Sequence, residues 1–172
     1  MVENNPNKKH TIIVWLEDEP GALNRVVSLF RRRAFNIESL NVGHTEESKV
    51  SRMTLCVVGE ESIVEQITKQ LYKLLEVIKV TDVTSEGAVI REMAMVKVTA
   101  DNPQARSEIM QFAEIFKARV LDVAPDSILL EAVGPEDEID RLFGLVRRYG
   151  IKESVRTGRV AMARGAVTVG AI

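Results

Sequence analysis

The sequence predicts an α+β protein built from two tandem ferredoxin-like units, each with the element order β-α-β-β-α-β. Strand-like runs of β-branched residues alternate with helical stripes, whose apolar residues recur every three or four positions, and the same order is found twice. A short turn-forming segment, Ser85-Glu86-Gly87, separates the two halves. We therefore expect one domain at residues 1–85 and a second at residues 86–172, each an antiparallel sheet with two helices on one face.

The first unit opens with a strand at residues 10–16, which is β-branched and aromatic and is apolar on both faces. A helix follows from Pro20, which suits the first helical position because its missing N–H costs nothing there. We expect this helix to end near Arg33. Its apolar stripe consists of Leu23, Val26, Val27 and Phe30.

A hairpin, a second helix and a fourth strand complete the first unit. The hairpin strands are expected at residues 35–42 and 49–58, joined by a polar loop, and the helix follows Gly59. The closing strand is expected at residues 77–83. The apolar stripe of the second helix consists of Ile63, Val64, Ile67, Leu71, Leu74 and Leu75.

The second unit repeats this order. Strands are expected at residues 93–100, 119–123, 127–133 and 153–163, and the segment 165–172 carries no pattern. One helix begins at Asn102-Pro103 and the other follows Gly134-Pro135 and is closed by Gly150, which suits a helix C-terminus. The two buried stripes consist of Ile109, Phe112, Ala113 and Phe116, and of Ile139, Leu142, Phe143 and Val146.

Composition excludes several classes of protein. A formal net charge of -2 argues against a dedicated nucleic-acid binder, and the compact basic run Arg31-Arg32-Arg33 complements the dipole at a helix C-terminus. The single cysteine, Cys56, excludes an intrachain disulfide, and its apolar strand indicates a buried position. With no long apolar run and no signal-peptide core, we expect a cytoplasmic protein or a mature organellar product.

No catalytic residue and no metal site is predicted. The acidic clusters Glu60-Glu61 and Glu136-Asp137-Glu138 stand at helix starts, where the dipole favours negative charge. His10 and His44 have no third ligand at a suitable spacing, and Gly21 does not belong to a glycine-rich phosphate loop.

The turn between the first strand and the first helix is the best candidate for a ligand site. A helix that begins at Pro20-Gly21-Ala22 presents free N–H groups to a carboxylate, and Gly21 lets a ligand approach closely. Asp18 offers an acceptor for an ammonium group, and Asn36, at the start of the returning strand, offers a donor and an acceptor. Leu23 and Ile37 could house an apolar side chain.

These features suit a zwitterionic amino acid, provided that the turn and the returning strand lie close in space, as we expect. The simpler interpretation is that Asp-x-Pro-Gly only turns a strand into a helix. A third interpretation is an RNA-binding ferredoxin-like module, in which aromatic residues on the central strands stack on bases. Here Trp15 is the sole aromatic on the first strand and residues 51–57 have none, which disfavours RNA binding.

Several longer stretches resemble a known family. Residues 17–26 read Glu-Asp-Glu-Pro-Gly-Ala-Leu-Asn-Arg-Val, and residues 29–43 contain Ala-Phe-Asn-Ile-Glu-Ser-Leu-Asn-Val-Gly. Together with Arg91-Glu92-Met93 and Arg156-Thr157-Gly158, they resemble the small regulatory subunit of acetohydroxyacid synthase (acetolactate synthase), which has an N-terminal ACT domain. The resemblance extends over nearly the whole chain.

The resemblance implies a non-catalytic protein that activates a thiamine-diphosphate-dependent large subunit and confers feedback inhibition by branched-chain amino acids, usually valine. Thiamine diphosphate, magnesium and FAD would belong to the large subunit, and this chain would hold no cofactor. The effector site would lie where two ACT domains pair in a homodimer. By matching positions, the site residues would be Asp18, Pro20, Gly21, Ala22, Leu23, Asn24, Asn36 and Ile37. A free-standing amino-acid-binding ACT module is the alternative.

Two positions depart from the family pattern. Some members have asparagine where this chain has Asp18, whose carboxylate would attract the ammonium of an effector but repel its carboxylate. The family often has glycine where this chain has Ala34. If that helix end is left-handed, alanine costs roughly 1 kcal/mol.

Overall fold

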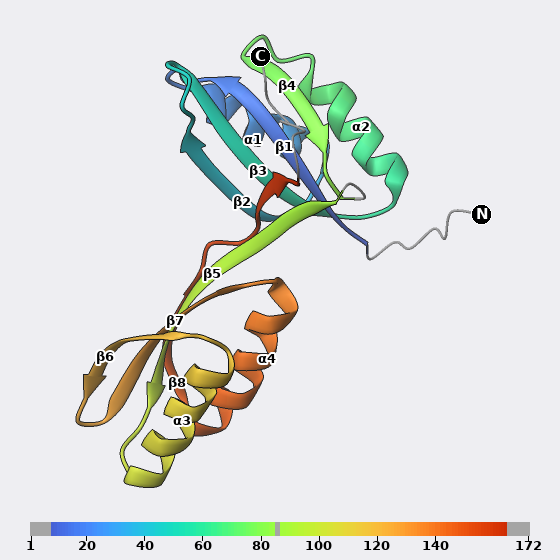
Figure 1. The fold of residues 1–172 in the computed structure, drawn as a ribbon. Coiled ribbons are helices and arrows are strands. Elements are labelled where there is room, and N and C mark those ends of the chain that lie inside the picture. The colour runs from blue at the N-terminus through green and yellow to red at the C-terminus, as the bar shows by residue number, and fades with distance from the viewer. Residues whose placement is uncertain (1–7, 85–86, 165–172) are drawn as a thin grey trace. The chain divides into compact units, whose positions relative to one another are not determined.

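The computed structural model of the protein describes residues 8–84 and 87–164. It contains the predicted β-α-β-β-α-β order twice, which confirms the α+β class (Figure 1). The first set is β1 Lys9–Glu17, α1 Ala22–Arg32, β2 Ile37–His44, β3 Val50–Val58, α2 Glu61–Leu71 and β4 Val77–Asp82. The second set is β5 Ala88–Thr99, α3 Pro103–Ile115, β6 Arg119–Ala124, β7 Ser127–Gly134, α4 Glu136–Val146 and β8 Ile151–Arg156, with a 3-10 turn at Arg147–Tyr149 and a further strand, β9 Val160–Ala163.

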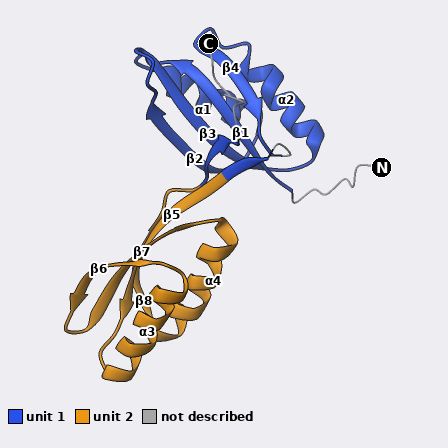
Figure 2. Ribbon diagram, viewed as in Figure 1, with its two compact units in different colours: residues 1–89, 159–172 blue, residues 90–158 orange. Residues whose placement is uncertain are grey.

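The chain divides into two compact units, residues 1–89 with 159–172 and residues 90–158 (Figure 2). The last strand, β9, thus returns to the first unit, and β5 spans the point of division. The domain boundaries expected from the sequence, 1–85 and 86–172, stay a prediction. Ser85 and Glu86 lie outside the described residues.

The first unit has a four-stranded antiparallel sheet in the order β2-β3-β1-β4, so that β2 is an edge strand. Alternate residues of β1, among them Ile12 and Val14, face α1 and α2 and are fully buried. The same core takes Phe30 from α1 and Ile67 from α2. The two helices therefore cover one face of the sheet, as the sequence predicts.

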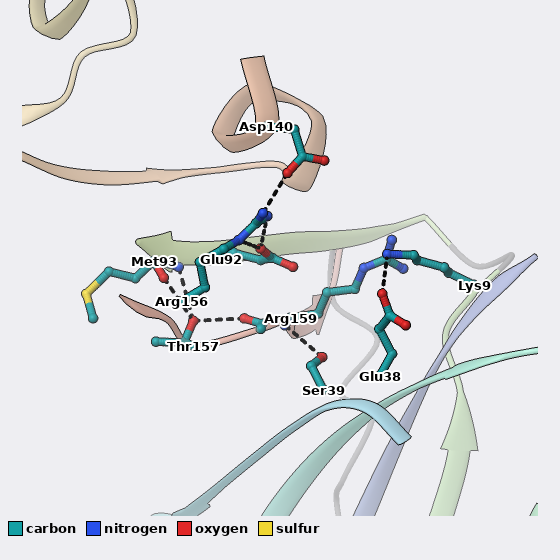
Figure 3. A network of polar contacts seen from close by, with 10 residues as sticks. Lys9, Glu38, Ser39, Glu92, Met93, Asp140, Arg156, Thr157 and Arg159 are labelled. Atoms are coloured by element: carbon teal, nitrogen blue, oxygen red, sulfur yellow. Dashed lines mark hydrogen bonds and ion pairs between the residues drawn. The ribbon is translucent and has the colours of Figure 1, made fainter. Parts of the chain in front are cut away.

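The short strand β9 lies against part of the opposite face of the first sheet (Figure 1). The Arg52 guanidinium donates a hydrogen bond to the carbonyl of Ala161 at 2.5 Å, and the Arg159 N–H donates to the Ser39 hydroxyl at 3.4 Å (Figure 3). Arg52 also lies over the Trp15 ring, 5.5 Å from its centroid. Burial lowers the pKa of Arg52.

The second unit repeats the strand order as β6-β7-β5-β8, with β9 also pairing with β5. Its core is lined by Val96 and Val98 from β5, Ile109 from α3 and Leu142 from α4. At one end of the unit, Arg156 contacts the buried carboxylate of Glu92 at 2.6 Å and Asp140 at 2.6 Å (Figure 3). These contacts fix the end of β8 against β5.

The first helix of each unit ends in the same left-handed turn. Ala34 has φ 55° and Lys117 has φ 52°, and each follows the C-cap residue of its helix. In the first unit, the Phe35 N–H donates to the carbonyl of Phe30 at 3.0 Å, and the two rings pack edge to face. Because both helix ends use this motif without glycine, both carry the cost of a left-handed side chain.

Three sequence predictions are wrong in detail. The first helix begins at Ala22, one residue after its left-handed N-cap, so Pro20 lies in the preceding turn instead of at the first helical position. The second helix ends at Leu71, and Leu75, predicted to be buried, is exposed. The final strand expected at residues 153–163 is divided in two, because Gly158 has φ 76° and breaks the extended backbone.

Candidate functional site

The start of α1 is an open helix N-terminus. Gly21, the N-cap, has φ 91° and ψ -9°, and no side chain caps the helix. The first turn contains no acidic residue, and Pro20 and Gly21 are exposed. The first N–H groups of a helix have no partner within it and carry partial positive charge. Here the Ala22 N–H donates to the carbonyl of Glu19 at 3.1 Å, so the N–H groups of Leu23 and Asn24 are the ones left for an external acceptor, and binding of an anionic group at this turn stays a prediction.

Asp18 is held by the hairpin between β2 and β3. Its backbone N–H donates to the carbonyl of Lys49 at 2.7 Å, and its Oδ1 accepts a hydrogen bond from the Ser51 hydroxyl at 3.1 Å. Its Oδ2 lies 3.0 Å from Nδ1 of His44, a side chain that is 82% exposed. Ser51 thus orients the Asp18 carboxylate. Because His44 is exposed, its contact with Asp18 is weak and a ligand can replace it.

Within one chain, Asn36 and Ile37 do not lie beside this turn, and the expectation that they do is wrong. Ile37 pairs with Val57, whereas His44, at the other end of β2, pairs with Ser51 beside the Asp18 turn. The six residue steps from Ser51 to Val57 on β3 span about 20 Å at the rise of a β-strand. The helix α1 carries the chain across this length, so its start and the start of β2 lie at opposite ends of the sheet.

Leu23 and Val27 occupy a side of α1 that the core does not use. The buried residues of the helix are Ala22, Val26, Leu29 and Phe30, so the predicted stripe is rotated, and Leu23 and Val27 are each 41% exposed. On the edge strand, Val42 is 43% exposed and pairs with Met53, a core residue on the helix-covered face. The first unit thus presents exposed apolar side chains from the helix α1 and from the edge strand β2.

Other types of site find no support in the described residues. Trp15 is 4% exposed, so its ring offers no surface on which a base could stack. Within residues 8–84 and 87–164, no group of three or more His, Cys, Asp or Glu side chains could hold a metal ion. Cys56 is buried in β3, as predicted. No helix in the described part of the chain is long and apolar enough to cross a membrane.

Comparison with known proteins identifies the family. Residues 12–79 match the model of the AHAS small subunit-like ACT domain, and residues 91–165 match that of the small subunit of acetolactate synthase. A probable acetolactate synthase small subunit from Archaeoglobus fulgidus is 52% identical over 157 residues, which cover 91% of this chain and 98% of the relative. The chain belongs to the acetolactate synthase small-subunit family.

Two further relatives agree with this assignment. The acetolactate synthase small subunit of Mycolicibacterium smegmatis is 44% identical over 98% of each chain. The crystal structure of the small subunit from Thermotoga maritima has a TM-score of 0.85 and 38% identity, covering 93% of this chain and 99% of that one. Small-subunit proteins are regulatory, so this chain is a regulatory subunit and not the catalytic one.

The small-subunit fold brings together residues that the sequence analysis did not connect. Ser51 and His44 were not predicted near Asp18, because their proximity comes from the register of the β2–β3 hairpin. Glu92 and Arg156 belong to two short stretches on which the resemblance relied, and they form an ion pair across strands 64 residues apart. The one sign of such a pair in the sequence is a glutamate at a core-facing position of an alternating strand, because a glutamate is rarely buried without a partner.

Proposed function

We propose that this small subunit activates an acetolactate synthase large subunit in the cytoplasm and makes it sensitive to feedback inhibition by a branched-chain amino acid, with valine as the principal effector. The uncapped start of α1 carries the proposal. The effector carboxylate would bind the N–H groups of the first turn, near Gly21, and its ammonium would bind Asp18. Leu23 would contact its apolar side chain. Thiamine diphosphate, magnesium and FAD would be held by the large subunit.

The remaining site residues, Asn36 and Ile37, would come from a second copy of the chain. If two β2 edge strands pair antiparallel about a two-fold axis, the start of one strand lies beside the end of the other. Asn36 of one copy then approaches the turn of Asp18 and Gly21 in its partner. This arrangement would also cover Leu23, Val27 and Val42, which are exposed in the single chain.

Regulation follows from linkage between the effector and the subunit assembly. An amino acid bound by residues of two copies favours one arrangement of the pair, and that arrangement would activate the large subunit less. Such coupling free energies are typically about 1–3 kcal/mol, a five- to 150-fold change in affinity. Asn24, which is exposed on the first turn of α1, would adjust the effector preference.

Substitution of Gly21 by aspartate tests the site. The new carboxylate would repel that of the effector, so Gly21→Asp should abolish valine inhibition of the enzyme reconstituted with its large subunit. Gly21→Asn is the uncharged control for backbone strain, and Asn102→Asp introduces the same charge at the equivalent N-cap of α3, where aspartate caps as well as asparagine. Asn102→Asp should keep inhibition, and Gly21→Asn, which adds a side chain at the site without a charge, should weaken inhibition less than Gly21→Asp does; unchanged inhibition in Gly21→Asp would refute the site assignment.

A further inference from the structure

We propose that the first unit contains a second small-molecule site, which binds a compound with a primary ammonium group in a pocket beside α2. The pocket has a volume of about 470 Å³, within the range of roughly 300–1,000 Å³ that is common for ligand sites. Its inner wall is formed by His10 of β1, Val64 and Thr68 of α2, and by Asp82 and Thr84 at the end of β4.

His10 supplies a buried acceptor that has no partner. Its side chain is 1% exposed, and its Nε2 lies 2.9 Å from the carbonyl of Gly59. Because a carbonyl only accepts, Nε2 carries the hydrogen, and in that tautomer Nδ1 presents a lone pair. Among the contacts of residues 8–84 and 87–164, this Nδ1 has no hydrogen-bond donor. A buried acceptor without a donor is costly, so the position favours a donor group.

Asp82 supplies a second acceptor in the same pocket. Its Oδ1 accepts hydrogen bonds from the backbone N–H of Thr84 at 2.9 Å and from the Thr84 hydroxyl. The Thr84 hydroxyl in turn accepts from the backbone N–H of Thr11 at 2.9 Å. These bonds fix the carboxylate and use one oxygen, which leaves Oδ2 to accept from a ligand. The pocket therefore combines a neutral acceptor with an anionic one.

The charges at the pocket rim favour a cation. Lys8 contacts Glu61 at 3.1 Å, and Lys69 contacts Glu65 at 2.5 Å, so each ammonium at the rim already has a carboxylate. The carboxylate of Asp82 is left without a cation among the pocket's ion pairs. With three N–H donors on a compact charge, a primary ammonium group can bond Nδ1 of His10 and Oδ2 of Asp82 together. A metal ion would find only two strong ligands here.

This pocket is separate from the proposed effector site. His10 is near the start of β1 and Asp18 follows its end, and eight residues of strand span about 25 Å. The pocket also lies on the β4 side of the sheet, away from the edge strand β2. Occupation of one site therefore leaves the other free.

Titration of the full chain with n-propylammonium chloride tests the proposal. We expect a saturable shift of the His10 ring resonances in a ¹⁵N NMR spectrum, with no such shift from sodium propionate, which lacks a donor group. His10→Gln keeps a donor for Gly59 but loses the Nδ1 acceptor, and it should bind propylammonium at least about tenfold more weakly. Asp82→Asn retains the oxygen that Thr84 bonds and should weaken binding to a similar extent.

Glu114→Gln, an exposed position on α3, is the matched control and should bind as the unmodified chain does. Unfolding curves of each variant report whether it folds. If His10→Gln does not fold, Asp82→Asn alone tests the proposal. Three results would overturn the proposal: no saturable shift, as expected if only water occupies the pocket; equal affinity in Asp82→Asn; or tighter binding of zinc chloride than of propylammonium at His10.

Discussion

The helices α1 and α3 occupy the same place in their units, but their first turns are built differently. In α3, the Asn102 side chain accepts a hydrogen bond from the Ala105 N–H at 2.8 Å, and Pro103 follows it. In α1, Gly21 takes a left-handed conformation and no side chain caps the helix. The second unit thus uses a side chain to satisfy one N–H of its helix N-terminus, whereas in the first only the Ala22 N–H is satisfied, by the carbonyl of Glu19, and the N–H groups of Leu23 and Asn24 are left for another acceptor.

This difference separates a binding turn from a structural one within a single topology. Strand order and helix placement are shared by both units, so topology alone does not select the ligand site. The choice of N-cap residue does, because it decides whether the helix N-terminus is already occupied.

Alanine at the two N-caps should destabilise the protein for different reasons. Gly21→Ala places a side chain at φ 91° and should lower the free energy of unfolding by about 1–2 kcal/mol. Asn102→Ala removes a capping hydrogen bond and should lower it by about 1 kcal/mol. Urea unfolding measures both.

The conservative variants distinguish these causes. Gly21→Asn should cost less than Gly21→Ala, because asparagine tolerates the left-handed region, and Asn102→Gly should cost only about a few tenths of a kcal/mol. If Gly21→Ala were neutral, the left-handed turn would not constrain this position and the contrast between the two caps would fail.

Glycine at the two equivalent helix ends should stabilise both units alike. Ala34→Gly and Lys117→Gly each relieve a left-handed side chain, which stabilises the folded state, and each add freedom to the unfolded chain, which opposes this gain. We expect the free energy of unfolding to rise by about 0.5–1 kcal/mol. Thermal unfolding measures the gain. Gln111→Gly, inside α3, is the control and should lose stability by about 0.5–1 kcal/mol. A loss at Ala34 would mean that its side chain contributes more than its backbone costs.

The smallest effect concerns acid stability and belongs to the second unit. The hydroxyl of Tyr149 donates to Glu108 and, with a bond from Gln104, lowers the pKa of that carboxyl. The ionised Glu108 carboxylate therefore stabilises the fold at pH values above its unfolded pKa of about 4.3. This contribution is lost as the pH falls through the lower pKa of the folded state. Tyr149→Phe should make this acid loss shallower.

Urea unfolding at a series of pH values between about 3 and 6 measures this slope. Tyr72→Phe is the matched control in the first unit, because within the described part of the chain the Tyr72 hydroxyl bonds only the backbone of Val80. It should change stability without changing the acid slope. Equal slopes in the Tyr149→Phe variant and the unmodified chain would exclude the proposed role of the hydroxyl.

Element type and order could be predicted because they depend on local patterns. The alternation in β5 and the spacing of Ile139, Leu142 and Val146 on α4 are properties of short segments, and all three helix residues are buried. The exposed face of α1 was predicted less well. Its Leu23 and Val27 fit an apolar stripe as well as Leu29 does, and burial depends on how the helix is rotated over the sheet.

By itself, the sequence determined the tandem fold, the open helix turn at Gly21 and the family to which the chain belongs, since each is carried by residues close together in the chain. Only the tertiary structure decided that Asn36 lies at the far end of the sheet from that turn, that Arg52 lies over Trp15, and that His10 and Asp82 share a pocket. These facts depend on strand register and on how helices and strands far apart in the sequence pack together. Neither is determined by local sequence patterns. The turn of Asp18 and Gly21 is one half of a site whose other half, in our proposal, a second chain provides.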